Sequence, residues 1–245
     1  MDQLLVALDV DTAAEARALA DALRGAVGGF KVGSRLFTSH GPTVVEQLVA
    51  RGDRVFLDLK FHDIPNTVAG AIAAAVRLGV WMVNVHAAGG AAMMRAAVEA
   101  ARDEAGRLST RPPLVIAVTM LTSLSESNLA ESGFSGSMRQ SVERLARLAQ
   151  DSGLDGVVAS PQEISLIRQT CGPSFTIVTP GIRGAGDERG DQSRTMSAPD
   201  ALKAGVGYLV VGRPIIAAPD PRKAAEGIAG TCRATLSGSP QLPTP

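Results

Sequence analysis

The feature that decides the fold is a charged stretch between two apolar segments, Asp58-Leu59-Lys60-Phe61-His62-Asp63-Ile64-Pro65-Asn66-Thr67. The apolar run at residues 54–57 precedes it and is typical of a buried parallel strand. Residues 68–76 follow it and consist mostly of good helix formers. This order predicts that two acids and a lysine lie at the carboxyl end of a strand, just before a helix.

Asp58 and Lys60 are expected on the same face of that strand, because strand side chains alternate. Asp63 lies in the turn that follows. Each acid favours the charged form of the lysine. The pattern therefore predicts a fixed ammonium group that can deliver a proton to a carbanion, rather than the neutral amine that a Schiff base needs. The alternative interpretation is a structural ion pair at a strand end, although buried charge is costly.

The chain has 245 residues, of which 45% are hydrophobic, so it can form one large domain or two small ones. Its formal net charge is zero and only 3% of its residues are aromatic, which argues against a nucleic-acid-binding surface. The first residues lack the pattern of a signal peptide, and no apolar stretch approaches the length of a membrane span. Cys171 and Cys232 match no metal-ligand spacing, so we expect reduced thiols in a cytoplasmic protein.

Short apolar segments recur along the chain, each followed by a segment with helical features. We predict eight strands, at residues 4–10, 29–33, 54–60, 81–86, 114–120, 156–160, 175–178 and 208–211. Strands that alternate with helices in this way predict a single (β/α)8 TIM barrel of the α/β class. A doubly wound sheet is the alternative, but it favours a glycine-rich turn after its first strand, where this chain has Asp9-Val10-Asp11.

The helices are predicted from capping patterns and apolar spacing. Capping boxes at Thr12–Glu15 and Ser160–Glu163 mark helix starts, and apolar residues at helical spacing predict a helix at residues 137–150. Further helices are expected at residues 12–24, 41–51, 69–78, 91–105, 198–204 and 221–236. We therefore assign residues 1–236 to one barrel domain and expect the polar, proline-rich residues 237–245 to form a disordered tail.

In a (β/α)8 barrel the active site lies at the carboxyl ends of the strands. The polar residues predicted at those ends are Asp9, Lys31, Asp58, Lys60, Asn84, His86, Thr119, Thr122, Ser160, Arg183 and Arg213. Asp9 can accept a hydrogen bond from a sugar hydroxyl, and Lys31 can balance an acid or bind a ligand oxygen. For each residue alone, a salt bridge in the barrel mouth is the competing interpretation. Together they predict a charged pocket.

Residues 181–194 form a long polar segment with four glycines, typical of a mobile loop that closes over a ligand. Gly212 and Arg213 follow the eighth strand, where this fold usually binds phosphate. Arg183 and Gln192 can close over the same group. A solvated surface loop with ordinary arginines is the alternative interpretation.

The spacing of His40, His62 and His86 does not indicate a metal cluster, and no set of carboxylates and histidines has metal-ligand spacing. Strand alternation would turn His62 towards the same side as Lys60 and Asp63, but a packing role is equally consistent with its position. The sequence has neither a Gly-x-Ser-x-Gly nucleophile turn nor a Walker-type loop.

Four motifs carry a resemblance to a known family. They are Phe-Lys-Val-Gly at residues 30–33, the charged stretch at 58–67, Val-Thr-Met-Leu-Thr-Ser at 118–123 and Thr-Pro-Gly-Ile-Arg at 179–183. In this order they make the sequence similar to the bacterial form of the orotidine 5′-phosphate decarboxylases. The second motif is highly specific, and the resemblance extends from Leu-Asp-Val at 8–10 to Gly-Arg-Pro at 212–214.

The resemblance implies decarboxylation of orotidine monophosphate to uridine monophosphate, the last step of de novo UMP biosynthesis. It also implies a homodimer with no metal, no organic cofactor, no nucleic acid and no membrane partner. By the motif match, Lys60 is the proton donor and Asp58 its charged neighbour, while Asp63 acts in the site of the neighbouring subunit with Thr67 beside it. The implied substrate contacts are Asp9 and Lys31 to the ribose, Thr122 to the pyrimidine, and Arg183, Gln192, Gly212 and Arg213 to the phosphate.

Two other functions remain as alternatives. One is a related sugar-phosphate decarboxylase or synthase on the same barrel, which shares an acid-x-Lys-x-x-Asp core but uses magnesium. The residues at 61–67 and the segment around Gln192 argue against it, and activity in excess chelator separates the two. The other is a barrel that binds nucleotides without catalysis, against which the intact set of Asp58, Lys60 and Asp63 argues.

Overall fold

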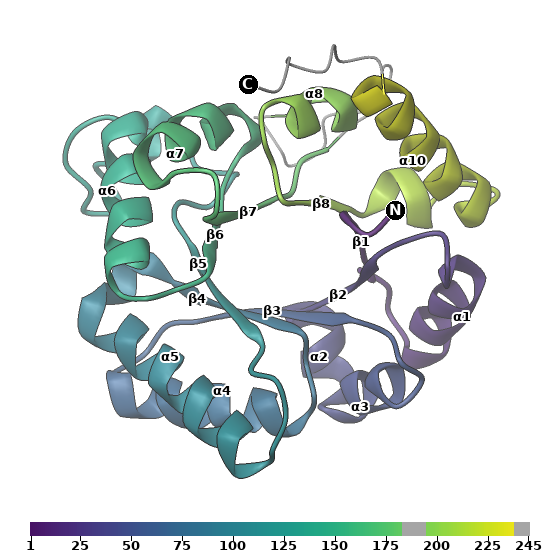
Figure 1. Ribbon diagram of the computed structural model, residues 1–245, viewed down its shortest axis with the longest axis horizontal. Coiled ribbons are helices and arrows are strands. Elements are labelled where there is room, and N and C mark those ends of the chain that lie inside the picture. The colour runs from purple at the N-terminus through teal and green to yellow at the C-terminus, as the bar shows by residue number, and fades with distance from the viewer. Residues whose placement is uncertain (183–194, 238–245) are drawn as a thin grey trace, which may run out of the picture.

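Eight parallel strands close into a barrel in the computed structural model, which describes residues 1–182 and 195–237 (Figure 1). Each strand pairs with the next one along the chain, and β1 also pairs with β8, with Leu5 opposite Val210. The strands are β1 (Leu4–Ala7), β2 (Gly29–Gly33), β3 (Val55–Phe61), β4 (Met82–His86), β5 (Leu114–Val118), β6 (Gly156–Val158), β7 (Thr176–Thr179) and β8 (Tyr208–Val211). The β1–β8 pairing confirms the predicted barrel and excludes a doubly wound sheet, in which the outermost strands have free edges.

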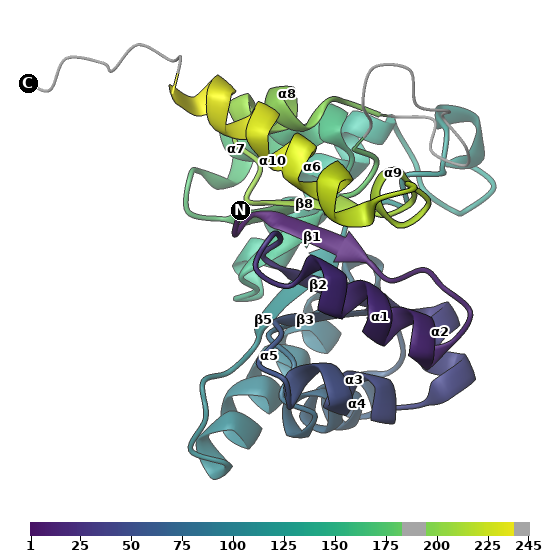
Figure 2. The ribbon, with the colours of Figure 1, turned by 90° about the vertical axis from the view of Figure 1, so that its right-hand side faces the viewer.

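Helices surround this barrel on the outside (Figure 1). The α-helices are α1 (Ala13–Leu23), α2 (Ser34–His40), α3 (Thr43–Val49), α4 (Pro65–Arg77), α5 (Gly90–Arg107), α6 (Met138–Asp151), α7 (Ile164–Cys171), α8 (Ala198–Lys203), α9 (Arg213–Ile216) and α10 (Pro221–Ser237). Short 3₁₀ turns are η1 (Ala87–Gly89), η2 (Glu126–Asn128) and η3 (Pro161–Glu163). Helix α10 lies against α1 and α8, so it closes the ring between the last and the first units (Figure 2). None of the described helices is long and apolar enough to cross a membrane.

The core has two layers. Nine side chains fill the inside of the barrel: Leu5, Ala7, Phe56, Met82, Ile116, Val118, Val158, Val178 and Val210. A larger cluster packs between the strands and the helices. Because both faces of each strand are buried, the strands read as near-continuous apolar runs, which is why they were recognisable in the sequence.

The amino-terminal end of the barrel is packed with large side chains. Trp81 and Tyr208, the only tryptophan and the only tyrosine of the chain, meet edge to face with ring centroids 5.0 Å apart. The guanidinium of Arg54 lies 5.4 Å from the centre of the Trp81 ring, in cation–π geometry. Both aromatic rings pack against the inner core cluster. This packing leaves the carboxyl ends of the strands as the open mouth of the barrel.

Both capping boxes predicted from the sequence are present in the structure. Thr12 and Glu15 form a reciprocal capping box, in which the Glu15 N–H donates to Thr12 Oγ1 at 3.2 Å and the Thr12 N–H donates to Glu15 Oε2 at 3.0 Å. The Ser160 N–H likewise donates to Glu163 Oε2 at 2.9 Å, although the turn that begins there is the 3₁₀ turn η3, which leads into α7. These bonds satisfy N–H groups that the first turn of a helix leaves free.

The structure corrects several predicted boundaries. The helix expected at residues 41–51 is α3 alone, and α2 precedes it as a separate helix that ends at His40. Gly41 caps α2, and its φ of +64° favours glycine. Helix α9 was not predicted. Strands β1 and β5 end at Ala7 and Val118, two or three residues earlier than expected, because the following residues leave the sheet. Helix α10 extends through Ser237, and the rest of the expected tail lies outside the described residues.

Candidate active site

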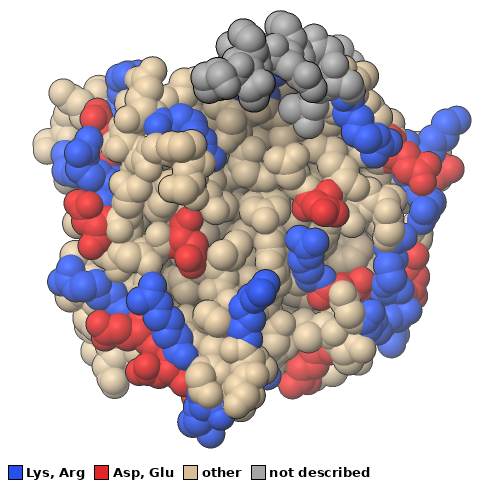
Figure 3. All heavy atoms as spheres, in the orientation of Figure 1, with Lys and Arg blue, Asp and Glu red and all other residues tan. Residues whose placement is uncertain are grey.

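A cavity of about 270 Å³ opens at the carboxyl ends of the strands. Figure 3 shows this end of the molecule as a hollow of mostly uncharged atoms, with acidic and basic side chains inside it and around its rim. Of the predicted site residues, those that line the cavity are Asp9, Lys31, Asp58, Lys60, Thr122, Gly212 and Arg213. Residues from both ends of the chain therefore meet in one place, as the barrel topology predicts.

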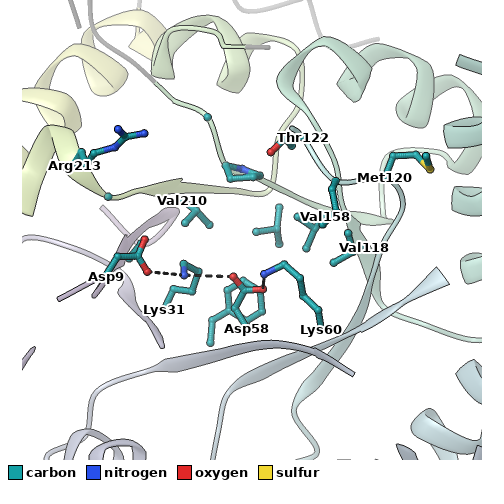
Figure 4. Close-up of a pocket in the computed structure, with 17 residues that line it drawn as sticks. Asp9, Lys31, Asp58, Lys60, Val118, Met120, Thr122, Val158, Val210 and Arg213 are labelled. Carbon is teal, nitrogen blue, oxygen red and sulfur yellow. Dashed lines mark hydrogen bonds and ion pairs between the residues drawn. The ribbon is translucent and has the colours of Figure 1, made fainter. Parts of the chain in front are cut away.

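Four charged side chains form a continuous chain across one side of the cavity (Figure 4). The Lys31 ammonium lies 3.2 Å from Asp9 Oδ1 and 3.3 Å from Asp58 Oδ2. The Lys60 ammonium donates a hydrogen bond of 2.7 Å to Asp58 Oδ1. The signs alternate along this chain, so each charge has an opposite charge beside it. Such pairing is what allows charged groups to be kept in a partly buried site.

Lys31 is the most enclosed member of this network. Burial of its ammonium acts to lower the pKa, but the negative charges of Asp58 and Asp9 outweigh that effect, so the pKa of Lys31 is raised above its usual value. Lys31 is therefore a permanent cation at neutral pH. A Cβ atom at Gly33 would lie 2.9 Å from the Lys31 Nζ, so the glycine of the Phe-Lys-Val-Gly motif makes room for this ammonium.

Lys60 occupies an irregular part of β3. Its φ is +54°, a left-handed conformation that costs a side-chain-bearing residue about 1–2 kcal/mol. Strand β3 also shifts its register against β4 between Leu57 and Phe61. The predicted contact between Lys60 and Asp58 is present, but simple alternation does not explain it. The lysine is aimed by a local distortion of the strand, as is common beside active sites.

The opposite side of the cavity is apolar and carries few polar groups. Its wall comes from the ends of the later strands, where Val118, Val158 and Val210 line it (Figure 4). Val178 of β7 also lines the cavity. Thr122 lies in the loop after β5, and Gly212 and Arg213 lie after β8. A ligand with one flat apolar part and one anionic part would therefore find a matching surface for each.

Asp63 and Thr67 do not line the cavity of their own chain. Both are exposed, and the Asp63 carboxylate accepts a 2.6 Å hydrogen bond from the N–H of Ile64. Ile64, next to Asp63, is 67% exposed, more than any other large hydrophobic residue in the described part of the chain. The turn at residues 62–64 thus exposes an acid and an apolar side chain that do not line the cavity.

The remaining candidates fall into two groups. Arg183 and Gln192, with most of the segment expected to form a mobile loop, lie outside the described residues. Asn84, His86, Thr119 and Ser160 do not line the cavity. Asn84 lies in the middle of β4 and His86 ends that strand, whereas Thr119 and Ser160 follow β5 and β6. Thr119 instead ties β5 to β6, because its Oγ1 donates to the carbonyl of Val158 at 3.2 Å.

The His62 ring lies beside the His86 ring, with centroids 5.5 Å apart, and does not line the cavity. Burial lowers the pKa of His86, and its electrostatic interactions with His62 and Lys60 lower it further. Neutral imidazole is thus favoured at this position. No group of three or more potential ligand side chains among the described residues is arranged to hold a metal ion. Cys171 and Cys232 are buried free thiols, and burial raises the pKa of each.

The side chain that sequence reasoning left without a role is Asn84. It was noted as a polar residue at a strand end, but the sequence carried no sign of its contacts. In the structure its Nδ2 donates to Asp58 Oδ1 at 2.7 Å and its Oδ1 accepts the Lys60 N–H at 2.8 Å. These partners depend on the register of β3 against β4, which a single sequence does not reveal.

A closed barrel of eight parallel strands, with a charged cavity at their carboxyl ends, defines a (β/α)8-barrel enzyme. Comparison with known proteins agrees with this class and narrows it. Residues 2–228 match the model of the orotidine 5'-phosphate decarboxylase / HUMPS family, and the chain belongs to this family.

Similar proteins bear the decarboxylase name. The chain is 56% identical over 229 residues to an orotidine 5'-phosphate decarboxylase of Moorella thermoacetica, covering 93% of this chain and 91% of the relative. It is 53% identical over 234 residues to that of Syntrophotalea carbinolica, covering 96% of each. The crystal structure of orotidine 5'-phosphate decarboxylase from Lactobacillus acidophilus matches with a TM-score of 0.84 at 36% identity, over 95% of this chain and 99% of the other.

Proposed function

We propose that this chain decarboxylates orotidine 5'-monophosphate to uridine 5'-monophosphate and carbon dioxide, with Lys60 as the proton donor. The family match and the names of the similar proteins support the reaction. The observation that supports the role of Lys60 is its ammonium group, which faces the cavity while its hydrogen bond to Asp58 fixes it in place.

The reaction needs a group that stabilises negative charge on a carbon atom. When the bond between the pyrimidine ring and its carboxylate breaks, the electron pair stays on the ring carbon and carbon dioxide leaves. An ammonium group beside that carbon stabilises the developing charge by electrostatic attraction. It then transfers one proton to the carbon, so the ring gains a C–H bond and the lysine becomes neutral. Asp58 keeps the lysine oriented before this step.

The rest of the cavity suits the other parts of the nucleotide. The apolar wall beside Thr122 matches the flat pyrimidine, and Asp9 with Lys31 matches the ribose hydroxyls, since one accepts and the other donates hydrogen bonds. Gly212 and Arg213, after β8, stand where this fold usually binds phosphate, and Arg183 and Gln192 are expected to act with them. Phosphate binding remote from the reacting carbon can supply energy for orientation.

We also propose a homodimer in which Asp63 and Thr67 complete the cavity of the neighbouring subunit. The exposure of both residues and of Ile64 beside them supports this arrangement, because an interface would cover the apolar side chain. The acid would then approach Lys60 from the far side of the cavity, and each lysine would have a carboxylate from both chains.

The second candidate is the related sugar-phosphate decarboxylase or synthase on the same barrel. Several similar proteins at 51–56% identity are named as decarboxylases, which favours the first function. The two are separated by measuring the loss of orotidine monophosphate absorbance with purified protein in excess chelator. Undiminished turnover is expected of the decarboxylase, whereas inactivity under every condition would contradict the proposal.

Lys60→Ala tests the proton donor. We expect decarboxylation to fall by several orders of magnitude while the circular dichroism spectrum and the melting temperature stay close to those of the unaltered protein, since proton donation and charge stabilisation are both lost. Lys203→Ala, which removes an exposed lysine from α8, is the matched control and should keep full activity. Normal turnover in Lys60→Ala would show that another group donates the proton.

A further inference from the structure

Asn84 lies opposite the irregular part of β3. Leu57 pairs with Val83 and Phe61 pairs with Val85, so three residues of β3 face a single residue of β4. Paired parallel strands normally advance residue for residue. The extra residues of β3 therefore have no regular backbone partner on β4, and they include both Asp58 and Lys60.

The Asn84 side chain supplies the partners that the ladder lacks. Its Oδ1 accepts the Lys60 N–H at 2.8 Å, and its Nδ2 donates to Asp58 Oδ1 at 2.7 Å. Asp58 Oδ1 is the same atom that accepts the hydrogen bond from the Lys60 ammonium. Asn84 is 0% exposed, so water does not replace its amide in either bond. The buried amide of Asn84 thus holds both the backbone of Lys60 and the carboxylate of Asp58. These two groups set the direction of the Lys60 ammonium.

We infer that Asn84 is a positioning residue for the proposed proton transfer, because it holds Lys60 in its left-handed backbone conformation and turns Asp58 Oδ1 towards the lysine ammonium. The inference rests on the role proposed for Lys60. Lysine reaches its position through a flexible four-carbon chain, so the direction of its ammonium depends on where its backbone and its carboxylate partner are held. A displacement of about 1 Å is enough to lower a reaction rate substantially.

A residue that only held strands together would affect folding and little else. Asn84→Ala removes both hydrogen bonds. We expect its kcat to fall about tenfold to hundredfold, while the dissociation constant for uridine monophosphate changes less than about threefold, because the proposed ribose and phosphate contacts lie elsewhere in the cavity. A loss of kcat at nearly constant product affinity is the signature of positioning.

Asn84→Asp separates the two bonds. The carboxylate still accepts the Lys60 N–H, but it cannot donate to Asp58 and places a second acid against it. Adjacent carboxylates tend to share a proton, so we expect this variant to lose activity at a higher pH than the unaltered protein as the solution is made acidic. The amide bonds to Asp58 and to the backbone of Lys60, the Lys31 ammonium lies 3.3 Å from Asp58 Oδ2, and His86 follows two residues later on β4.

Gln150→Ala is the matched control. Gln150 likewise has a side-chain amide that makes a hydrogen bond, although it is half-buried and Asn84 is fully buried. Its Nε2 donates to the carbonyl of Cys171 at 2.7 Å, near the end of α6 and outside the cavity. It should lower the melting temperature without changing kcat. If Asn84→Ala behaves like Gln150→Ala, with reduced stability but normal kcat, the inference is wrong. If Asn84→Ala does not fold, the pH profile of Asn84→Asp decides, and an unshifted profile at normal kcat overturns it.

Amide hydrogen exchange tests the role of Asn84 without any enzymatic turnover. Amide hydrogen exchange at Lys60 should be faster in Asn84→Ala than in the unaltered protein, because the N–H loses its acceptor. Equal exchange rates would contradict the inference even if decarboxylation is observed. Absence of decarboxylation in the unaltered protein would instead contradict the proposed function, and the exchange result would still report whether Asn84 holds the backbone of Lys60.

Discussion

Asp58 illustrates at the scale of one residue how the site is held. Its Oδ1 accepts hydrogen bonds from Lys60 and Asn84, and its Oδ2 lies 3.3 Å from the Lys31 ammonium. A buried carboxylate without partners would cost several kcal/mol. Here the three nitrogen groups satisfy both oxygens, so the acid can stay charged beside the cavity and hold Lys60 in one direction.

Arg213 carries a prediction at the same scale. We expect Arg213→Ala to weaken the binding of uridine monophosphate by about 1.5–3 kcal/mol, the usual strength of a hydrogen bond to a charged group. Binding of uridine, which lacks the phosphate, should hardly change. Titration calorimetry with both ligands measures this, and Arg17→Ala on α1 serves as a control for loss of an exposed arginine. Equal losses for nucleotide and nucleoside would show that Arg213 does not meet the phosphate.

At the scale of elements, an ion-pair cluster joins the neighbouring helices α4 and α5. Glu104 of α5 accepts a hydrogen bond of 2.9 Å from Arg77 of α4, and Arg107 binds both of its oxygens at 2.7 and 3.0 Å. The hydrogen bonds from Arg107 and then Arg77 lower the pKa of Glu104 to about 2. Helix α4 begins immediately after the turn that carries Asp63, so this cluster anchors the helix behind that turn.

The lowered pKa gives a prediction with a definite sign. A carboxyl group whose pKa is lower in the folded protein binds its proton more readily in the unfolded chain, so its contribution to stability is present above about pH 4.5 and is lost as the pH falls towards about 2. Glu104→Gln should therefore lower the melting temperature modestly at neutral pH, and the difference from the unaltered protein should shrink across that acidic range. Glu99→Gln, an exposed position on the same helix, is the control. A difference that does not depend on pH would contradict the ion-pair explanation.

At the scale of the whole molecule, the proposed homodimer would let two chains share their cavities. Each chain presents its own Asp58 and Lys60 in one cavity and turns Asp63 away from it. With two-fold symmetry, the same surface meets its own copy, so an acid that leaves one cavity can enter the other. The exposed Ile64 next to Asp63 would be covered in that assembly.

Subunit exchange tests this arrangement. Lys60→Ala and Asp63→Ala should each be nearly inactive alone. After mixing and exchange, a heterodimer would have one site with both lesions and one intact site, so activity should approach about half that of the unaltered dimer per heterodimer. Lys60→Ala mixed with Asp58→Ala is the control and should stay inactive, because both residues line the cavity of the same chain. Continued inactivity of the first mixture, with heterodimers demonstrated, would rule out shared sites.

The sequence by itself determined the class of fold and the charged residues that line the cavity. Buried parallel strands are apolar on both faces, and Thr12 caps α1 through local bonds, so eight strands and most helix starts could be read without a structure. Barrel topology then brings the carboxyl ends of all strands together, and seven of the predicted site residues do line one cavity. Short helices such as α2 and α9 were missed because they carry too few residues to show a period.

Only the tertiary structure determines the direction of the Lys60 ammonium. Three features set its direction: the left-handed backbone of Lys60, the register shift of β3 against β4, and the two hydrogen bonds of Asn84. These hydrogen bonds join residues that are 24 and 26 positions apart in the chain. No local propensity predicts them, since lysine and asparagine at strand ends are compatible with many registers. Register is a property of two strands packed together, and the direction of a side chain beside a bulge follows from that packing. The charged residues of the candidate site can be recognised in the sequence, whereas the direction of Lys60 depends on how β3 pairs with β4.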